Sequence, residues 1–262
     1  ENAYEILNYL PIDANDLEKI YINNHLFAAF QVVNEEDEPV RAFSILPFHL
    51  LFMFSIQYKV YRISAYKKEE YLEVLNFCNL RDKGNKEVLE QNPPIASSNG
   101  NIPNTCSVRN LSLIPEKQIF DFFTIINVDQ ETIESAKELV RIRSTYAHAN
   151  GNIEEDIEDK IEEYLKVLRT IQLRMLEVNK NTQNWIDEIE EGESLEDFFK
   201  VRFLQSQFSP YDFGDVISTL LESDKLDEEQ WYQVVGKGLE LSYNETISAL
   251  RYILINDLDK DR

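Results

Sequence analysis

The chain has 262 residues, 43% of them hydrophobic and 11% aromatic, so it can bury a packed core in one large domain or in a typical domain with a smaller one. Seven Gly and eight Pro are too few for a turn-rich β-sandwich or barrel, and we expect long helices instead. The net charge of −22 excludes unaided, non-specific binding to DNA, RNA or an anionic membrane, because such binding depends on clustered Lys and Arg.

The first third of the chain predicts three helices. A short helical lead-in over residues 1–14 ends at Pro11, and Asp13 or Asn15 can cap a helix from Asp16 to Val33. His25 lies within the amphipathic pattern of that helix, and we interpret it as a partly buried structural residue. A charged loop then leads to a helix from about Val40 to Ala65, and another helix follows from Lys67 to Leu80.

The helix from about Val40 to Ala65 is apolar around most of its circumference, which is typical of a helix buried among others. Its most apolar part, Ala42 to Tyr58, is interrupted by Pro47, His49, Ser55 and Gln57. A bilayer span needs about twenty predominantly apolar residues, so we expect a core helix and no membrane association.

Residues 81–115 carry repeated turn signals, including Pro93-Pro94 and Asn99-Gly100. We expect a long loop with a short helix at Lys86–Gln91. Loops of this length within compact domains are commonly functional, and this one could fold over a site on the following helices. A helix from Pro115 to about Asn127 leads from it to the next element.

The stretch that carries recognisable chemistry runs from Arg141 to Gly151, at the end of a helix that begins near Gln130 and is capped by Asp129 or Thr132. At about 100° per residue, Ser144 and His148 share one face and Arg141 lies nearly in line with them. Arg143 is offset from His148 by roughly 140°, so the two meet only if the helix frays or a second chain completes the site. A guanidinium and an imidazole together suit phosphoryl transfer at neutral pH.

Two plain interpretations compete with a functional one in this stretch. His148 can be a helix-terminal histidine whose charge favours the C-terminal end of the helix dipole. Glu134 and Glu138 can pair with basic residues along a solvated face, for example Glu138 with Arg141 at i,i+3, or they can orient the Arg or His for catalysis.

After Gly151, apolar residues at helical spacing predict a long helix from about Ile153 to Val178, which forms an antiparallel hairpin with the preceding helix. The members of its apolar stripe are Ile153, Ile157, Ile161, Leu165, Leu168, Ile171, Leu173, Met175 and Leu176. We place a domain boundary at the polar break that follows, which gives a helical bundle at 1–180 and a second module at 181–262.

The second module carries −12 of the net charge and predicts several short helices, at about Trp185–Glu191, Leu195–Phe208, Phe213–Glu222, Asp227–Leu239 and Asn244–Ile255. The last two have the lengths of a helix-turn-helix, but their acidity makes DNA binding improbable, because recognition helices need cationic support. We expect an acidic module that docks a protein partner.

The spacing Arg143-Ser144-Thr145-Tyr146-Ala147-His148 resembles the motif of the HEPN superfamily, in which an Arg is followed by a His after four to six residues. Arg141 also satisfies that window. Arg143 matches better, because the family places a polar residue directly after its Arg and Ser144 fills that position. This chain has Asn150 where several members carry a Tyr that is nucleotidylated, so that form of regulation is not expected here.

The resemblance implies an all-α, HEPN-like antiparallel bundle and a metal-independent endoribonuclease without cofactors. Arg143 and His148 would be catalytic in an attack of the ribose 2′-hydroxyl on phosphorus, and Ser144, Asn150 and Arg141 would position the substrate. Active members are usually homodimers whose two motifs face each other, and toxin, phage-defence and RNA-processing roles are common settings.

Two other functions remain open from the sequence. The chain could be a catalytically inactive HEPN-like subunit that assembles with a protein partner through residues 181–262, or an acidic decoy that mimics nucleic acid. Cys78 and Cys106 are too few for a disulfide framework and have no partners at metal-ligand spacing, so we expect a cytoplasmic protein without a metal site.

Overall fold

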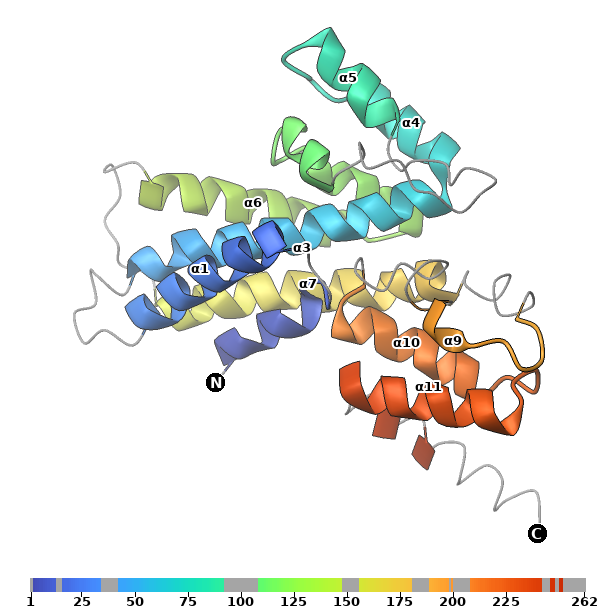
Figure 1. Ribbon diagram of the computed structural model, residues 1–262. Coiled ribbons are helices and arrows are strands. Elements are labelled where there is room, and N and C mark those ends of the chain that lie inside the picture. The colour runs from blue at the N-terminus through green and yellow to red at the C-terminus, as the bar shows by residue number, and fades with distance from the viewer. Residues whose placement is uncertain are drawn as a thin grey trace. The chain divides into compact units, whose positions relative to one another are not determined.

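The structure is a computed structural model that describes residues 2–12, 16–33, 42–91, 108–147, 156–180, 189–197, 199, 208–241, 246–247 and 250–251. All regular elements in these ranges are helices, which confirms the all-α class predicted from the scarcity of Gly and Pro (Figure 1). The chain divides into two compact units. The first comprises residues 1–10 and 14–174, and the second comprises residues 11–13 and 175–262.

Helix α3 (Ile45–Tyr66) is the central element of the first unit and contacts most of the others. The other elements of this unit, whether or not they contact α3, are η1 (Asn2–Tyr9), α1 (Asp16–Val33), η2 (Ala42–Ser44), α4 (Lys68–Asn76), α5 (Lys83–Glu90), η3 (Val108–Leu113), η4 (Ile119–Ile126), α6 (Gln130–Ala147) and the first part of α7 (Ile157–Lys180). The aromatic side chains of α3 explain its position, since Phe48 and Phe52 are almost fully buried. In the described ranges, no helix is long and apolar enough to cross a bilayer.

Helix α6 begins after a tight break that the sequence encodes. Asn127 adopts a left-handed conformation with φ 59°, which ends η4 and is tolerated by Asn better than by most residues. The carboxylate of Asp129 then accepts a hydrogen bond from the backbone N–H of Thr132 at 2.8 Å, so the predicted cap is present.

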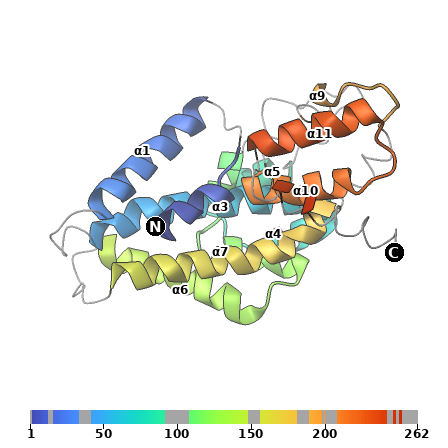
Figure 2. The ribbon, with the colours of Figure 1, turned by 90° about the horizontal axis from the view of Figure 1, so that it is seen from below.

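In both views of the ribbon, α6 and α7 run in opposite directions (Figures 1 and 2). The Tyr164 hydroxyl of α7 lies 3.3 Å from the backbone carbonyl of Leu139 on α6. Most of the predicted apolar stripe of α7 is buried. Leu173 and Leu176 are corrections, because Leu173 is 76% exposed and Leu176 is 38% exposed.

The second unit is a small helical body of α9 (Leu195–Asp197), α10 (Pro210–Leu221) and α11 (Glu228–Leu241), together with the last residues of α7. Its apolar core includes Leu195, Phe199, Phe213, Val216, Ile217, Leu220 and Val234. The boundary between the units falls after Arg174, inside α7, whereas the sequence placed it at the end of that helix. The predicted helices at 185–191 and 244–255 lie largely outside the described residues.

Helix α10 begins three residues earlier than predicted because its start is a capping box. Ser209 accepts a hydrogen bond from the backbone N–H of Asp212, and Asp212 accepts one from the backbone N–H of Ser209. Pro210 occupies the first helical position, where its missing N–H costs nothing.

Candidate functional site

Arg143 lies on the last part of α6 and is fixed by a carboxylate from outside its own helix. Its Nη2 is ion-paired with Oε2 of Glu116, on the turn that precedes η4. The Arg143 side chain is 27% exposed, and its Nε is buried with no hydrogen-bond partner among the described residues. The guanidinium is therefore held at one end and partly open to solvent.

Glu116 connects Arg143 to the core of the unit. Its Oε2 lies 3.6 Å from Nε2 of His49, just beyond hydrogen-bond distance but close enough for a charge interaction. The facing His49 imidazole and the Arg143 guanidinium hold the pKa of Glu116 below its usual range, against the opposing effect of partial burial. Glu116 is therefore ionised at neutral pH.

His49 is fully buried on α3 and is surrounded by the aromatic rings of Phe52 and Tyr164. Its Nδ1 lies 2.9 Å from the Tyr164 hydroxyl. Burial lowers the pKa of His49, and the Arg143 charge lowers it further, while the Glu116 carboxylate acts in the opposite direction. His49 is therefore neutral at pH 7, with a proton on one ring nitrogen and a lone pair on the other.

These four residues come from four separate elements and form one array, Tyr164–His49–Glu116–Arg143. Tyr164 lies on α7, His49 on α3, Glu116 on the turn before η4 and Arg143 on α6. Tyr164 and His49 are fully buried, whereas the side chains of Glu116 and Arg143 are partly exposed. We call these residues the Arg143 array.

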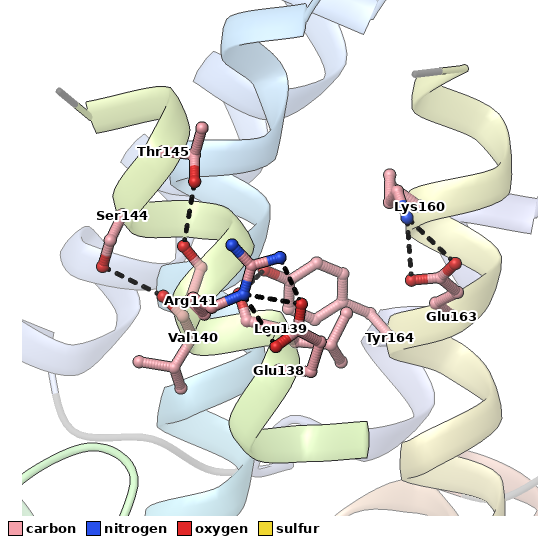
Figure 3. A network of polar contacts seen from close by, with 9 residues as sticks. All are labelled: Glu138, Leu139, Val140, Arg141, Ser144, Thr145, Lys160, Glu163 and Tyr164. Carbon is pink, nitrogen blue, oxygen red and sulfur yellow. Dashed lines mark hydrogen bonds and ion pairs between the residues drawn. The ribbon is translucent and has the colours of Figure 1, made fainter. Parts of the chain in front are cut away.

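Arg141 and Ser144 have local partners and are not part of the array (Figure 3). Arg141 is 61% exposed and forms a bidentate contact with Glu138, which confirms the predicted i,i+3 pairing along a solvated face. The Ser144 hydroxyl donates to the backbone carbonyl of Val140 at 3.0 Å, a bond that keeps it close to its own helix.

His148 and Asn150 lie outside the described residues, as does the break at Gly151. The predicted 140° offset between Arg143 and His148 therefore stays a prediction, and so does the role of a second chain in completing the site. The predicted cover from residues 81–115 also lies partly outside, since residues 92–107 are not described.

A groove of about 780 Å³ runs between α6 and α7, and none of its lining residues belongs to the Arg143 array. It is lined by Asp129, Glu131, Thr132, Glu134, Ser135, Glu138, Leu139, Glu163, Lys166, Val167 and Thr170. Five of these residues are acidic and one is basic. Several of the acids already have partners, such as Glu134 with Lys137 and Glu163 with Lys160. This face of the unit would attract cations and repel phosphates.

Sequence reasoning found Arg143 but missed the residues that fix it. Tyr164 stands in no recognisable motif, and Glu116 lies at the start of the helix predicted from Pro115 to about Asn127, where nothing distinguishes it from the other acidic residues of the chain. The available signal was His49, a histidine within the most apolar part of a largely apolar and aromatic helix. Such a residue needs polar partners when the helix is buried.

In the part of the chain that the structure describes, no three His, Cys, Asp or Glu side chains gather as metal ligands would. Comparison with protein-family models, with curated proteins and with solved structures finds no match to this chain. The assignment of a function therefore rests on the geometry around Arg143 and on the motif in which it stands.

Proposed function

We propose that the chain is a metal-independent endoribonuclease of the HEPN type that acts as a homodimer. The observation that carries this proposal is the position of Arg143. Of the two arginines in the motif, Arg143 is the one held by a carboxylate from another element, with its guanidinium partly exposed. A fixed, exposed guanidinium is suited to bind a phosphate at the moment when negative charge develops on it.

In the proposed reaction, the ribose 2′-oxygen attacks the neighbouring phosphorus and the bond from phosphorus to the 5′-oxygen breaks. The products are a 2′,3′-cyclic phosphate and a free 5′-hydroxyl. His148 removes the proton of the 2′-hydroxyl or protonates the leaving oxygen, a role typically worth about 10²–10⁴-fold in rate. Arg143 stabilises the charge on the phosphoryl oxygens, while Ser144, Asn150 and Arg141 position the phosphate.

The first test is RNA cleavage by purified Arg143→Ala and His148→Ala, measured on a fluorescently labelled single-stranded RNA in the presence of EDTA. We expect either variant to lose about 10²-fold or more of the parent activity. Lys137→Gln is the matched control, because Lys137 is also an α6 cation that pairs with an acid on η4, Asp121. Its exposure, 24% against 43% for Asp121, resembles that of Arg143 and Glu116.

Cleavage by His148→Ala at the parent rate would overturn the proposal, and so would cleavage of an all-deoxy substrate.

Mixing the two variants tests the dimer. If each site takes Arg143 from one chain and His148 from the other, half of the mixed population is heterodimeric and each heterodimer has one intact site. The mixture should then regain about one quarter of the parent activity.

A second candidate is a non-catalytic subunit that assembles with a cationic protein partner. The observation in its favour is that Glu116 neutralises the charge of Arg143, in a unit whose α6–α7 groove is also acidic. In this case Arg143→Ala and His148→Ala would leave partner binding unchanged, and deletion of residues 181–262 would abolish it. Partner binding that survives the deletion would exclude that module as the docking surface.

A further inference from the structure

We propose that His49 and Tyr164 are positioning residues that act on the Arg143 guanidinium through Glu116. The proposal depends on the proposed nuclease for its effect on catalysis, but the array itself can be tested without RNA. The two residues cannot touch a substrate, because both are fully buried. Any influence that they have on a phosphate must therefore pass through Glu116 and Arg143, which are the partly exposed members of the array.

The first step of the argument concerns the proton on His49. Glu116 is a carboxylate that can only accept, and its Oε2 faces Nε2 of His49 at 3.6 Å. If the ring proton were on Nδ1, a lone pair of Nε2 would point at this negative charge inside the protein. With the proton on Nε2, the ring presents an N–H to the carboxylate, which is the favourable arrangement.

The second step concerns the opposite side of the ring. With its proton on Nε2, His49 has an acceptor at Nδ1, and the Tyr164 hydroxyl at 2.9 Å can donate to it. The alternative acceptor for this hydroxyl, the carbonyl of Leu139, is more distant at 3.3 Å. The Glu116 carboxylate therefore favours the tautomer that directs an N–H toward it, and a hydrogen bond from Tyr164 to Nδ1 supports that tautomer, in the manner in which hydrogen-bonded partners orient the histidines of enzymes and metal sites.

The third step is what the array does to Glu116. A glutamate side chain on a surface turn normally samples several rotamers, and an arginine paired with it moves with it. The His49 N–H, fixed in the core, restricts where the carboxylate can lie and so restricts the guanidinium. The contact of 3.6 Å is longer than a hydrogen bond, as contacts in unliganded sites often are before a substrate tightens them.

The Lys137–Asp121 pair provides the internal comparison. It joins α6 to η4, next to the turn that carries Glu116, with an Nζ–Oδ1 distance of 2.9 Å and similar exposure, but it lies outside the array. If the Arg143–Glu116 pair were an ordinary surface ion pair, the two should behave alike. The array predicts that the Arg143 side chain is more rigid than the Lys137 side chain.

The experiment uses the whole 262-residue chain labelled with ¹⁵N. Long-range ¹H–¹⁵N spectra identify the tautomer of His49, and the Nε–Hε signal of Arg143 reports whether its guanidinium is fixed. We expect the Nε2-protonated form in the parent and mixed tautomers in Tyr164→Phe. We expect the Arg143 signal to broaden or vanish through solvent exchange in His49→Phe. His49→Gln, whose amide can still donate toward Glu116, should keep part of that signal.

In RNA cleavage, His49→Phe should lower kcat about 10–100-fold with little change in KM, because a mispositioned guanidinium fails mainly in the transition state. His49→Gln should recover part of kcat, and Lys137→Gln should match the parent. An Nδ1-protonated His49 in the parent would overturn the proposal, as would an Arg143 signal that is unchanged in His49→Phe. If His49→Phe does not fold, His49→Gln and Tyr164→Phe decide by the same criteria.

The spectra also separate this proposal from the nuclease itself. A parent protein that cleaves no RNA but shows the fixed Arg143 signal and the Nε2-protonated His49 would overturn the proposed function and support the array. A parent that cleaves RNA while His49→Phe retains the parent kcat would support the nuclease and overturn the positioning role.

Discussion

Arg143 and Arg141 lie on one helix, two residues apart, and differ in what fixes them. Arg141 is paired with Glu138 of its own helix at the surface, a contact typically worth a few tenths of a kcal/mol. Arg143 is connected through Glu116 to a buried imidazole and a buried phenol. The spacing to His148 admits both arginines, and the tertiary environment distinguishes them.

The burial of His49 predicts a pH dependence of stability. Burial keeps the pKa of His49 in the folded chain below that of an unfolded histidine. As the pH falls below about 6.5, the unfolded chain therefore binds more protons than the folded chain. The free energy of unfolding should therefore decrease from pH 7.5 to pH 5.5. Urea unfolding followed by circular dichroism at both pH values measures this decrease.

In His49→Gln the decrease over the same interval should be smaller, because the titrating group is gone. His25→Gln is the control, since His25 is only partly buried against Tyr21 and should retain most of the decrease. Glu116 adds a further loss at lower pH, as its own lowered pKa requires. Equal pH dependence in the parent and in His49→Gln would show that His49 titrates normally in the folded chain.

At the scale of residues, the motif alone predicted a site at Arg143, and the structure added the partners of that residue. Glu116 lies 27 residues before Arg143 and Tyr164 lies 21 residues after it, so no local spacing connects them. Such contacts depend on how α3, α6 and α7 pack, which periodicity does not specify. His148 and Asn150 stay predictions.

At the scale of elements, two glycines of α11 show how packing and helix propensity oppose each other. Gly238 is buried, and a Cβ added there would lie 2.5 Å from Thr246 Oγ1 and 2.9 Å from Ile217 Cγ2. Gly236 lies on the exposed side of the same helix, with nothing within 4 Å of an added Cβ. The same helix therefore contains Gly238, whose missing side chain allows close packing, and Gly236, whose missing side chain serves no packing contact.

We expect Gly238→Ala to lower the free energy of unfolding of the second unit by about 1–2 kcal/mol, because overpacking outweighs the gain in helix propensity. Gly236→Ala should raise it by about 0.5–1 kcal/mol. Urea unfolding followed by tryptophan fluorescence measures both, since Trp185 and Trp231 belong to the second unit. A gain in stability for Gly238→Ala would mean that Thr246 can move away.

Helix bounds were predictable where local signals are strong. Asp16–Val33 agrees at both ends, and the cap at Asp129 is present. The start of α10 differs because a capping box at Ser209 extends the helix beyond its apolar periodicity. Leu173 and Leu176 differ because, at about 100° per residue, they lie roughly 160° and 100° around the helix from the buried Met175, away from the buried face.

At the scale of the whole molecule, the net charge of −22 restricts how the chain could meet RNA. A homodimer would carry −44, and the acidic α6–α7 groove shows that the first unit contributes to this field. The motif arginines Arg143 and Arg141 supply positive charge at the proposed site, and Glu116 and Glu138 neutralise it in part. The approach of RNA should therefore be opposed by long-range repulsion.

This repulsion predicts an unusual dependence on salt. Raising the salt concentration from about 10 mM to about 150 mM shortens the Debye length from about 30 Å to about 8 Å, so kcat/KM for RNA cleavage should increase. A basic nuclease would show a steady decrease over the same range, through the loss of counterion release. A steady decrease for this chain would indicate a segregated basic surface that outweighs the net charge.

The division of the chain into units has a consequence for the order of events during synthesis. Residues 11–13 belong to the second unit, and the backbone N–H of Ile12 donates to the carbonyl of Phe208 at 2.8 Å. On the ribosome, Ile12 emerges 196 residues before its partner Phe208. The first unit can begin to fold during translation, but the second can close only when its last helices have been made.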